Sequence, residues 1–442
     1  MKVSTRRFLV FILCGLGWVA AVRAQTVQTV SDAPDYFHSA STSVSTSAEG
    51  DTCCVAGGAD YCGLGGWLRQ SCLLGDYASG EAPEPWTLID HLPRLRDNGY
   101  SVGGWISFGY QNKPDGAFTG NGPLLDDREW TSFNLNQAWL YIARTPDTGG
   151  CGWDWGFRVD VLYGVDGNEG QSFGNNPGRF DFLNGWDHGI YEWALPQVYA
   201  EIAYNDLSVK IGHFFTIIGY EVIPPLGNFF LSRQITFYNA EPFTHTGVLA
   251  TYQYSEDITL TGGWALGWDT GFDQLNQGNL VLSAMSWNIS EDVVLALYGA
   301  YGNAGWRGSR TNVSGAILSL QWTERFSTVH QFDVLGTNSG TDFVADGVAG
   351  DSIGMIHYAF YQLTDRVKSG IRQEWWKADS VSYYTLTGGF NVQATSNIMI
   401  RPELRYLWSP GTPGGAPGSI ADNIARIFDK EAVFGVDVTW TY

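Results

Sequence analysis

Apolar and polar residues alternate along most of the chain from about residue 100 onward, and the pattern is clearest in the last segment, Ala432–Tyr442. Side chains of a β-strand point alternately to its two faces. One face of this segment therefore carries Phe434, Val436, Val438, Trp440 and Tyr442, and the other carries Gly435, Asp437, Thr439 and Thr441. A carboxylate inside an apolar run suits a strand with lipid on one side and water on the other. The pattern predicts a membrane-spanning strand.

The same alternation predicts fifteen more strands, so sixteen are expected in total. Most have about ten or more residues, enough to cross a bilayer when tilted. An even number lets an up-and-down sheet close with both chain ends on one side. We therefore predict an all-β fold, a closed antiparallel transmembrane β-barrel of about 16 strands. The predicted strands are 100–110, 134–144, 153–165, 192–204, 207–215, 246–255, 257–268, 279–289, 292–302, 312–323, 326–336, 352–363, 366–376, 382–394, 397–408 and 432–442.

Short and long connections alternate between these strands. Polar two-residue turns are expected at 205–206, 256–257, 291–292, 324–325, 365–366 and 396–397. Long connections rich in Gly, Asn, Pro and Asp are expected at 111–133, 166–191, 216–245, 269–278, 303–311, 337–351, 377–381 and 409–431. Outer-membrane barrels have short periplasmic turns and long outer loops. The alternative, a secreted β-sandwich, would have turns of mixed length at both ends.

Composition supports the barrel and excludes one class of partner. Only 16% of residues are charged, 15% are aromatic, and there are 55 glycines. This balance is unusual for a soluble enzyme. It fits a barrel with aromatic girdles at the membrane interfaces and tight turns between strands. The formal net charge of −20 argues against nucleic acid as a partner, because binding to phosphates requires a basic surface.

The first 24 residues have the features of an export signal. Lys2, Arg6 and Arg7 precede an apolar run at 8–22, and Val-Arg-Ala at 22–24 is a small-residue cleavage site. A membrane-spanning helix is the alternative, but the apolar run is too short for one. We predict a signal peptide at 1–24.

The segment 25–97 precedes the predicted barrel domain, 98–442. It is Ser/Thr-rich, then Cys-rich, then Pro-rich, without a sustained period. We expect a poorly ordered leader or a small periplasmic segment. In an exported protein its cysteines are first interpreted as a disulfide framework. A zinc site is the alternative, which the absence of C-x-x-C spacing disfavours. The four cysteines are Cys53, Cys54, Cys62 and Cys72.

Several segments of the sequence resemble those of a known protein family. They are NQAWLYIAR, WGFRVDVLYG, LPQVYAEIAY, LSVKIGHFFTIIGYEV, EPFTHTGVLATY and the terminal DVTWTY. Together they resemble the OmpL-like outer-membrane β-barrel porin family over residues 98–442, whereas the Cys-rich leader departs from the family pattern. The resemblance implies an outer-membrane channel for small solutes, with no enzymatic activity expected.

Charged side chains in the predicted strands are expected to face the lumen. A Lys or Arg that faced lipid at mid-membrane would cost about 2–4 kcal/mol. The four arginines of the set, as a row, would set the field in the channel. The alternative is that these groups pair across strands and only solvate the wall. The predicted pore-lining residues are Arg158, Asp160, Glu201, Lys210, Lys368, Arg372, Glu374, Arg401, Glu403 and Arg405.

The third long connection, 216–245, is the predicted constriction. It carries bulky side chains that folding into the lumen would bury, namely Phe229, Phe230, Phe237, Tyr238 and Phe243. Glu221, Arg233 and Glu241 would then line the narrowest section, opposite the arginine wall. The alternative is a lid across the mouth or a contact between subunits.

Motifs for catalysis or for a resident cofactor are not found. The sequence has no G-x-S-x-G, no phosphate-binding loop and no paired zinc-ligand motif. Acidic residues concentrate in the long loops, where a solvated surface is the default interpretation and bridging divalent cations are the alternative. They are Asp115, Asp126, Asp127, Glu129, Asp166, Glu169, Asp181, Asp187, Asp342, Asp346, Asp351, Asp422 and Asp429.

These observations predict a passive diffusion channel for small hydrophilic solutes or ions in the bacterial outer membrane. The expected partners are membrane lipid and solutes, and a homotrimer is expected by analogy with general porins. The alternative is a barrel with a plugged lumen that serves as a structural or adhesive surface anchor through its acidic loops.

Overall fold

The computed structural model describes residues 85–112, 132–167, 187–188, 190–338, 343–346, 348–411, 415–416 and 419–442. The predicted signal peptide and most of the predicted leader lie outside these ranges, as do its cysteines Cys53, Cys54, Cys62 and Cys72. Of the acidic loop residues, Asp115, Asp126, Asp127, Glu129, Glu169, Asp181 and Asp342 also lie outside, together with the side chains of Asp187 and Asp346.

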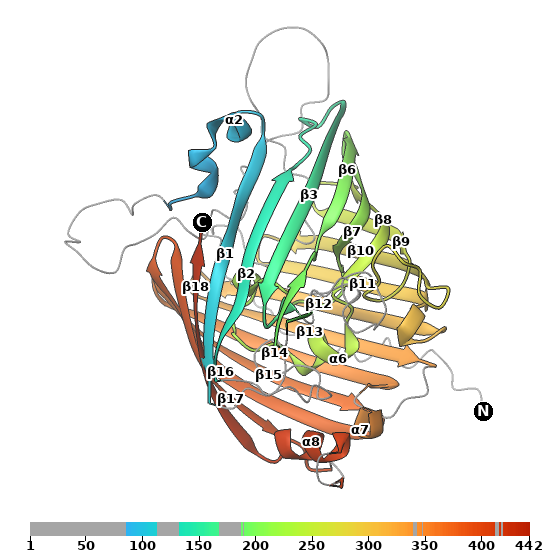
Figure 1. Cartoon of the computed structure of the whole chain (residues 1–442), viewed down its shortest axis with the longest axis vertical. Helices are drawn as coiled ribbons and strands as arrows, with labels where there is room; N and C mark the ends of the chain where they lie inside the picture. Colours follow the sequence, from blue (N-terminus) through green and yellow to red (C-terminus); the bar gives the residue numbers. More distant parts are fainter. Residues whose placement is uncertain are drawn as a thin grey trace, which may run out of the picture.

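Eighteen strands form one sheet in this part of the chain (Figure 1). They are β1 (Tyr100–Gln111), β2 (Phe133–Arg144), β3 (Trp153–Gly164), β4 (Asp187–His188), β5 (Tyr191–Ala194), β6 (Val198–Tyr204), β7 (Leu207–Phe215), β8 (Thr244–Gln253), β9 (Ile258–Ala265), β10 (Asn279–Ser290), β11 (Val293–Asn303), β12 (Thr311–Thr323), β13 (Phe326–Thr337), β14 (Asp351–Thr364), β15 (Val367–Ala378), β16 (Val381–Thr395), β17 (Ile398–Trp408) and β18 (Glu431–Thr441).

The sheet closes on itself as an antiparallel barrel. Strands pair with their neighbours in sequence, and β1 pairs with β18 in the register Trp105↔Thr441. β5 and β6 both pair with β3 and share one position in the wall, interrupted at 195–197. The short β4 pairs with β5. The wall therefore has sixteen positions, and the prediction of a closed sixteen-stranded barrel is confirmed.

Alternation along the strands separates an exposed apolar outer face from a buried inner face, and the inner face of the last strand is polar. In β18, Phe434 is 43% exposed and Trp440 is 40% exposed, whereas Asp437 and Thr439 are each 1% exposed. Exposed aromatic side chains also gather beside the turns, for example Trp153, Tyr204, Tyr254 and Trp322. Such aromatic residues are typical of the membrane–water interface.

One connection is shorter than predicted. The segment 377–381, expected among the long loops, is a two-residue turn in which Asp379 and Ser380 join β15 to β16. Both residues have positive φ, 45° and 81°, the conformation that matches the twist of a tight hairpin. The Asp379 carboxylate also accepts hydrogen bonds from the backbone N–H groups of Phe343, Gly350 and Asp351 in the preceding loop. The prediction was wrong because small polar residues mark both long loops and tight turns.

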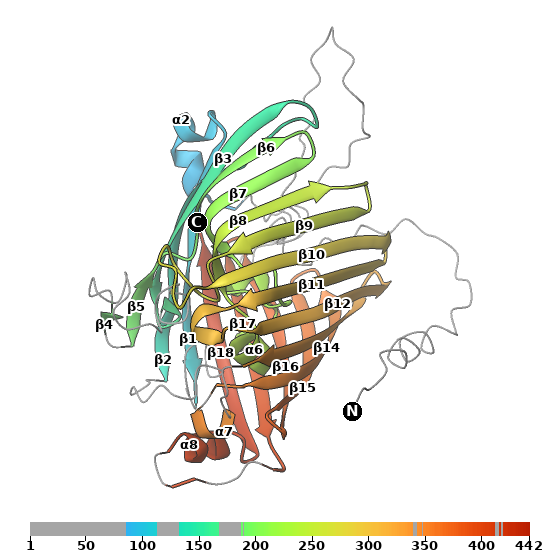
Figure 2. The same ribbon diagram turned by 90° about the vertical axis from the view of Figure 1, so that its right-hand side faces the viewer.

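Short helical segments lie at both ends of the barrel (Figures 1 and 2). The end of the predicted leader forms η2 (Leu88–His91) and α2 (Pro93–Arg96) beside the start of β1. Here Trp86 stacks on Trp440, and its backbone exchanges hydrogen bonds with the side chain of Asn397. At the opposite end, α7 (Phe343–Asp346) and α8 (Ile420–Ile427) cover an aromatic cluster that includes Trp376. No helix within the described ranges has the length and hydropathy needed to span a membrane.

Candidate functional site

The connection between β7 and β8, residues 216–243, lies inside the barrel, and we call it the lumen loop. It contains η3 (Pro225–Gly227) and α6 (Ile235–Ala240), and Figure 2 shows α6 within the ring of strands. Phe230, Phe237, Tyr238 and Phe243 are buried against the wall, as expected from the cost of leaving them in water. η4 (Gly305–Arg307) lies in a different loop, between β11 and β12.

Arg372 of β15 forms the first attachment of the lumen loop. Its guanidinium group lies 2.7 Å from the carboxylate of Glu221 and also donates to the backbone oxygen and hydroxyl of Ser232. The same carboxylate accepts from the Tyr358 hydroxyl and from the backbone N–H of Gln234. The side chains of the ion pair are only 0% and 2% exposed. Glu221 therefore contacts the arginine wall directly, whereas the sequence suggested that it faces that wall across an open gap.

Arg401 of β17 forms the second attachment. It is paired with Asp437 of β18, with 2.9 Å between Nε and the carboxylate. Its Nη2 also donates to Asp437, and its Nη1 donates to backbone oxygens of the lumen loop, those of Pro225, Asn228 and Phe230. Arg401 thus links the last two strands of the barrel to the tip of the loop. Asp437 was not among the predicted site residues, although a carboxylate in an apolar closing strand was a signal for it.

Two carboxylates attach the middle of the loop. Glu374 of β15 accepts from the backbone N–H groups of Ile235 and Thr236, each at 2.8 Å, at the start of α6. The N-cap residue Gln234 makes no side-chain cap of its own, so Glu374 takes that role from the barrel wall. Glu403 accepts from the backbone N–H of Ser232 at 3.1 Å.

The other two predicted constriction residues are buried within the same assembly. Arg233 donates to backbone oxygens of the lumen loop, those of Val222, Ile223 and Leu231. Glu241 accepts from Gln331 of β13. Arg233 therefore stabilises the shape of the loop, and Glu241 connects it to another part of the wall.

Glycines on the inner wall allow the loop to pack closely. A Cβ at Gly370 would lie 2.4 Å from the Phe229 ring, and one at Gly354 would lie 2.6 Å from the Thr236 hydroxyl. Within the loop, Gly219 has φ +88°, and a Cβ there would collide with the Glu241 carboxylate. Side chains at these positions would force the loop away from its place.

Asp269, between β9 and β10, closes the base of the lumen loop. Its carboxylate accepts from the backbone N–H groups of Phe243 and Thr244 at 2.6 and 3.0 Å. Removal of the carboxyl group from water raises the pKa of Asp269 to about 7 despite these hydrogen bonds. In an unfolded chain the pKa of an aspartate is about 3.9. Between these values the folded protein binds a proton that the unfolded chain does not bind.

This difference predicts a pH dependence of stability. The contribution of Asp269 to the free energy of unfolding is fully present below about pH 4 and is lost as the pH rises to about 7. Asp269→Asn keeps an acceptor oxygen and removes the titration. We expect the free energy of unfolding of the wild type, relative to Asp269→Asn, to fall as the pH rises through this window. Urea unfolding in lipid vesicles, monitored by tryptophan fluorescence at each pH, measures this free energy for both proteins. A difference that stays constant with pH would contradict the assignment.

The remaining predicted pore-lining residues lie elsewhere on the inner wall. Arg158 pairs with Asp160 at 2.7 Å, and its side chain is partly exposed. Lys210 lies 4.9 Å from the centre of the Tyr199 ring, and Glu201 accepts from Ser208. Lys368 lies 5.2 Å from the centre of the Phe360 ring. Arg405 is buried on the inner face of β17. The structure thus brings Arg372, Glu374, Arg401 and Glu403 together on the loop and leaves Arg158 and Lys210 apart from it.

A second feature of the wall, a run of strands without charged residues, was not predicted from the sequence. Strands β8 to β12 contain no Asp, Glu, Lys or Arg in any of their residues. The inner faces of these five strands, which we call the uncharged sector, consist mainly of small, aliphatic and hydroxyl side chains. This absence is visible in the sequence, but only the order of strands in the ring shows that it forms one continuous part of the wall.

The acidic loop residues whose side chains the structure describes do not form a metal site. Where side chains are described, no three His, Cys, Asp or Glu residues lie close enough together to hold a metal ion. Asp166, expected at a solvated surface, is buried, and its carboxylate accepts from Gln137 at 2.8 Å.

Comparisons with known proteins agree with this architecture. The sequence matches the family model described as "Putative beta-barrel porin-2, OmpL-like" over residues 99–441. No curated protein sequence matches the chain. Among solved structures, the chain is similar to the outer membrane channel DcaP of Acinetobacter baumannii, with 9% identity, a TM-score of 0.51, and coverage of 78% of this chain and 97% of that chain. It is also similar to OprB of Pseudomonas putida, with 14% identity, a TM-score of 0.50, and coverage of 79% and 96%. At such identities the likeness shows the fold alone.

Proposed function

This chain belongs to the family of OmpL-like β-barrel porins, and on that premise we propose that it is a passive diffusion channel for small hydrophilic solutes, narrowed by the lumen loop. The barrel is a multi-pass protein of the outer membrane. The observation that carries the proposal is the attachment of the lumen loop to one side of the inner wall through the buried Arg372–Glu221 ion pair and the hydrogen bonds around it. A loop fixed in this way reduces the cross-section of the channel and keeps its shape.

The attachments also support a role for the charged residues of the wall. Arg372 and Arg401 are buried, and their donors are directed at the lumen loop. Their positive charge is offset by Glu221 and Asp437. We therefore propose that these arginines position the constriction, and that the more exposed Arg158 acts on passing ions.

Planar bilayers provide the test. The purified barrel is expected to insert in discrete, ohmic conductance steps. Replacement of residues 217–242 by a short Gly-Ser linker should enlarge each step, because the segment no longer fills the lumen. Insertion without conductance in both proteins, with folding verified by heat-modifiable gel mobility, would contradict the channel and support the surface anchor. Conductance steps of equal size in the wild type and the linker variant would show that the loop is not the constriction.

We further propose that the barrels assemble as homotrimers, with membrane lipid around the remaining outer surface. The apolar outer face of the wall supports burial against lipid or against a second copy. Chemical cross-linking in native membranes distinguishes a ladder that ends at three copies from a monomer.

A further inference from the structure

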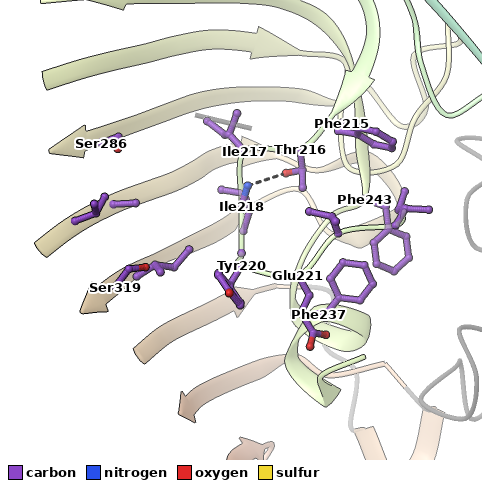
Figure 3. Close-up of a pocket in the computed structure, with 16 residues that line it drawn as sticks. Phe215, Thr216, Ile217, Ile218, Tyr220, Glu221, Phe237, Phe243, Ser286 and Ser319 are labelled. Atoms are coloured by element: carbon purple, nitrogen blue, oxygen red, sulfur yellow. Dashed lines mark hydrogen bonds between the residues drawn. The ribbon is translucent and has the colours of Figure 1, made fainter. Parts of the chain in front are cut away.

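The uncharged sector faces a cavity that the lumen loop leaves open. The cavity has about 740 Å³ of empty space, including the part that is open to solvent. One side is the first arm of the loop, with Ile217, Ile218 and Tyr220, and the other side is the inner wall of β10, β11 and β12 (Figure 3). The space beside the loop is therefore on the side of the wall without charged residues.

Strand register defines the floor of this cavity. Ser286, Ala296 and Ile317 are direct cross-strand neighbours and form one row across β10, β11 and β12. Val294 and Ser319 are paired in the next row. All five line the cavity. The floor is thus an aliphatic patch with a hydroxyl group at each of two opposite corners.

The two hydroxyl groups are available to a ligand. Ser286 and Ser319 are 4% and 7% exposed, and neither has a hydrogen-bonding partner among the residues that the structure describes. Buried hydroxyl groups ordinarily have partners. Figure 3 shows both residues on the wall strands across the cavity from Ile218 and Tyr220.

The lining of the cavity has few charged side chains. Among the described residues that line it, Glu221 is the one Asp, Glu, Lys, Arg or His, and its carboxylate is paired with Arg372. The rest of the lining includes Phe215, Phe237 and Phe243. Aromatic and aliphatic lining with a few polar groups is typical of sites that bind uncharged ligands with an apolar part.

We infer that this cavity is a binding site on the permeation path for uncharged solutes that combine an apolar face with hydroxyl groups. The inference rests on the proposed channel function and names a solute class for it. The apolar face of the solute packs between Ile218 and the row formed by Ala296 and Ile317. Its hydroxyl groups bond to Ser286 and Ser319. An ionised solute would lose hydration in the cavity without gaining a counter-charge.

Block of the ion current by three matched glycosides tests the inference. Phenyl β-glucoside has an apolar group and hydroxyls, methyl β-glucoside lacks most of the apolar surface, and phenyl β-glucuronide adds a negative charge. We expect phenyl β-glucoside to half-block the current at about a tenfold lower concentration than either of the others, because it alone buries an aromatic ring without burying a charge.

Two variants locate the site, with one matched control. Ser319→Ala removes one hydroxyl group and should weaken block by phenyl β-glucoside about fivefold, a modest loss typical of one hydrogen bond. Ala296→Leu should fill part of the cavity and weaken block by phenyl β-glucoside more than Ser319→Ala does. Leu318→Ala lies next to Ser319 but on the opposite face of β12, and should leave block unchanged.

The outcomes separate the two proposals. A folded barrel that never conducts overturns the channel function itself. A conducting barrel that all three glycosides block equally, or that the glucuronide blocks best, overturns the binding site and leaves the channel intact. If Ala296→Leu does not fold, Ser319→Ala still decides, because unchanged block by phenyl β-glucoside in that variant overturns the assigned contacts.

Discussion

Arg372→Met is expected to raise the single-channel conductance severalfold, because it removes the cation that holds Glu221 in the barrel. The pair is inaccessible to solvent on both sides, and Arg372 also holds Ser232. Breaking a buried pair by removing one partner costs about 3–5 kcal/mol, since the remaining charge stays buried without compensation. The lumen loop can relieve this cost by leaving the wall, which brings Glu221 into water.

The size of that cost determines how far the population of open channels shifts. A change of about 3–5 kcal/mol moves an equilibrium between attached and released loop by roughly two to three and a half orders of magnitude. We therefore expect larger conductance steps, with flicker between two levels, in planar bilayers. Lys210→Met is the matched control, because Lys210 is also a cation on the inner wall but contacts Tyr199 of β6. Unchanged steps in Arg372→Met, with folding preserved, would show that the pair does not hold the constriction.

Arg401→Met is expected to cause the largest loss of stability. It leaves Asp437 buried without its cation and removes the donors to three backbone oxygens of the loop. We expect the free energy of unfolding to fall by about 3–5 kcal/mol from the pair alone. Urea unfolding in lipid vesicles measures this change.

A double-mutant cycle separates the contribution of the Arg401–Asp437 ion pair to stability from that of the hydrogen bonds between Arg401 and the loop. Asp437→Asn is nearly isosteric and removes the charge that Arg401 compensates. If the stranded carboxylate causes most of the loss, Arg401→Met with Asp437→Asn should be more stable than Arg401→Met alone. Additive losses in the double variant would show that Arg401 acts mainly through the oxygens of Pro225, Asn228 and Phe230, and that the ion pair contributes little.

The wall of the barrel was predictable because its determinants are local. A period of two assigns each strand residue to a face, and the cost of a charge in lipid decides which face is inside. This reasoning placed Asp437 and Thr439 on the buried face of the last strand, as observed. It also predicted that the aromatic side chains of 216–245 would be buried in the lumen.

The contacts of the inward side chains were not predictable, because they join distant parts of the chain. Arg372 and Glu221 are 151 positions apart, and Arg401 and Asn228 are 173 apart. Periodicity shows that Arg372 faces inward but not what it meets there. The row of arginines therefore suggested a field across open water, whereas in the structure a folded segment occupies that space. The uncharged sector was overlooked for the same reason, since its meaning depends on where the loop lies.

The attachments of the lumen loop also constrain the order in which the molecule is made. The loop is synthesised before β14, β15, β17 and β18, the strands that supply Tyr358, Arg372, Arg401 and Asp437. Until these strands join the sheet, Glu221 and the backbone oxygens of Pro225 and Asn228 lack the donors that the wall supplies. Contacts between such distant segments form slowly, because a long stretch of chain must first be brought into register. Docking of this segment is thus a late step of biogenesis, and we expect the pore to become narrow only once β17 and β18 are in place.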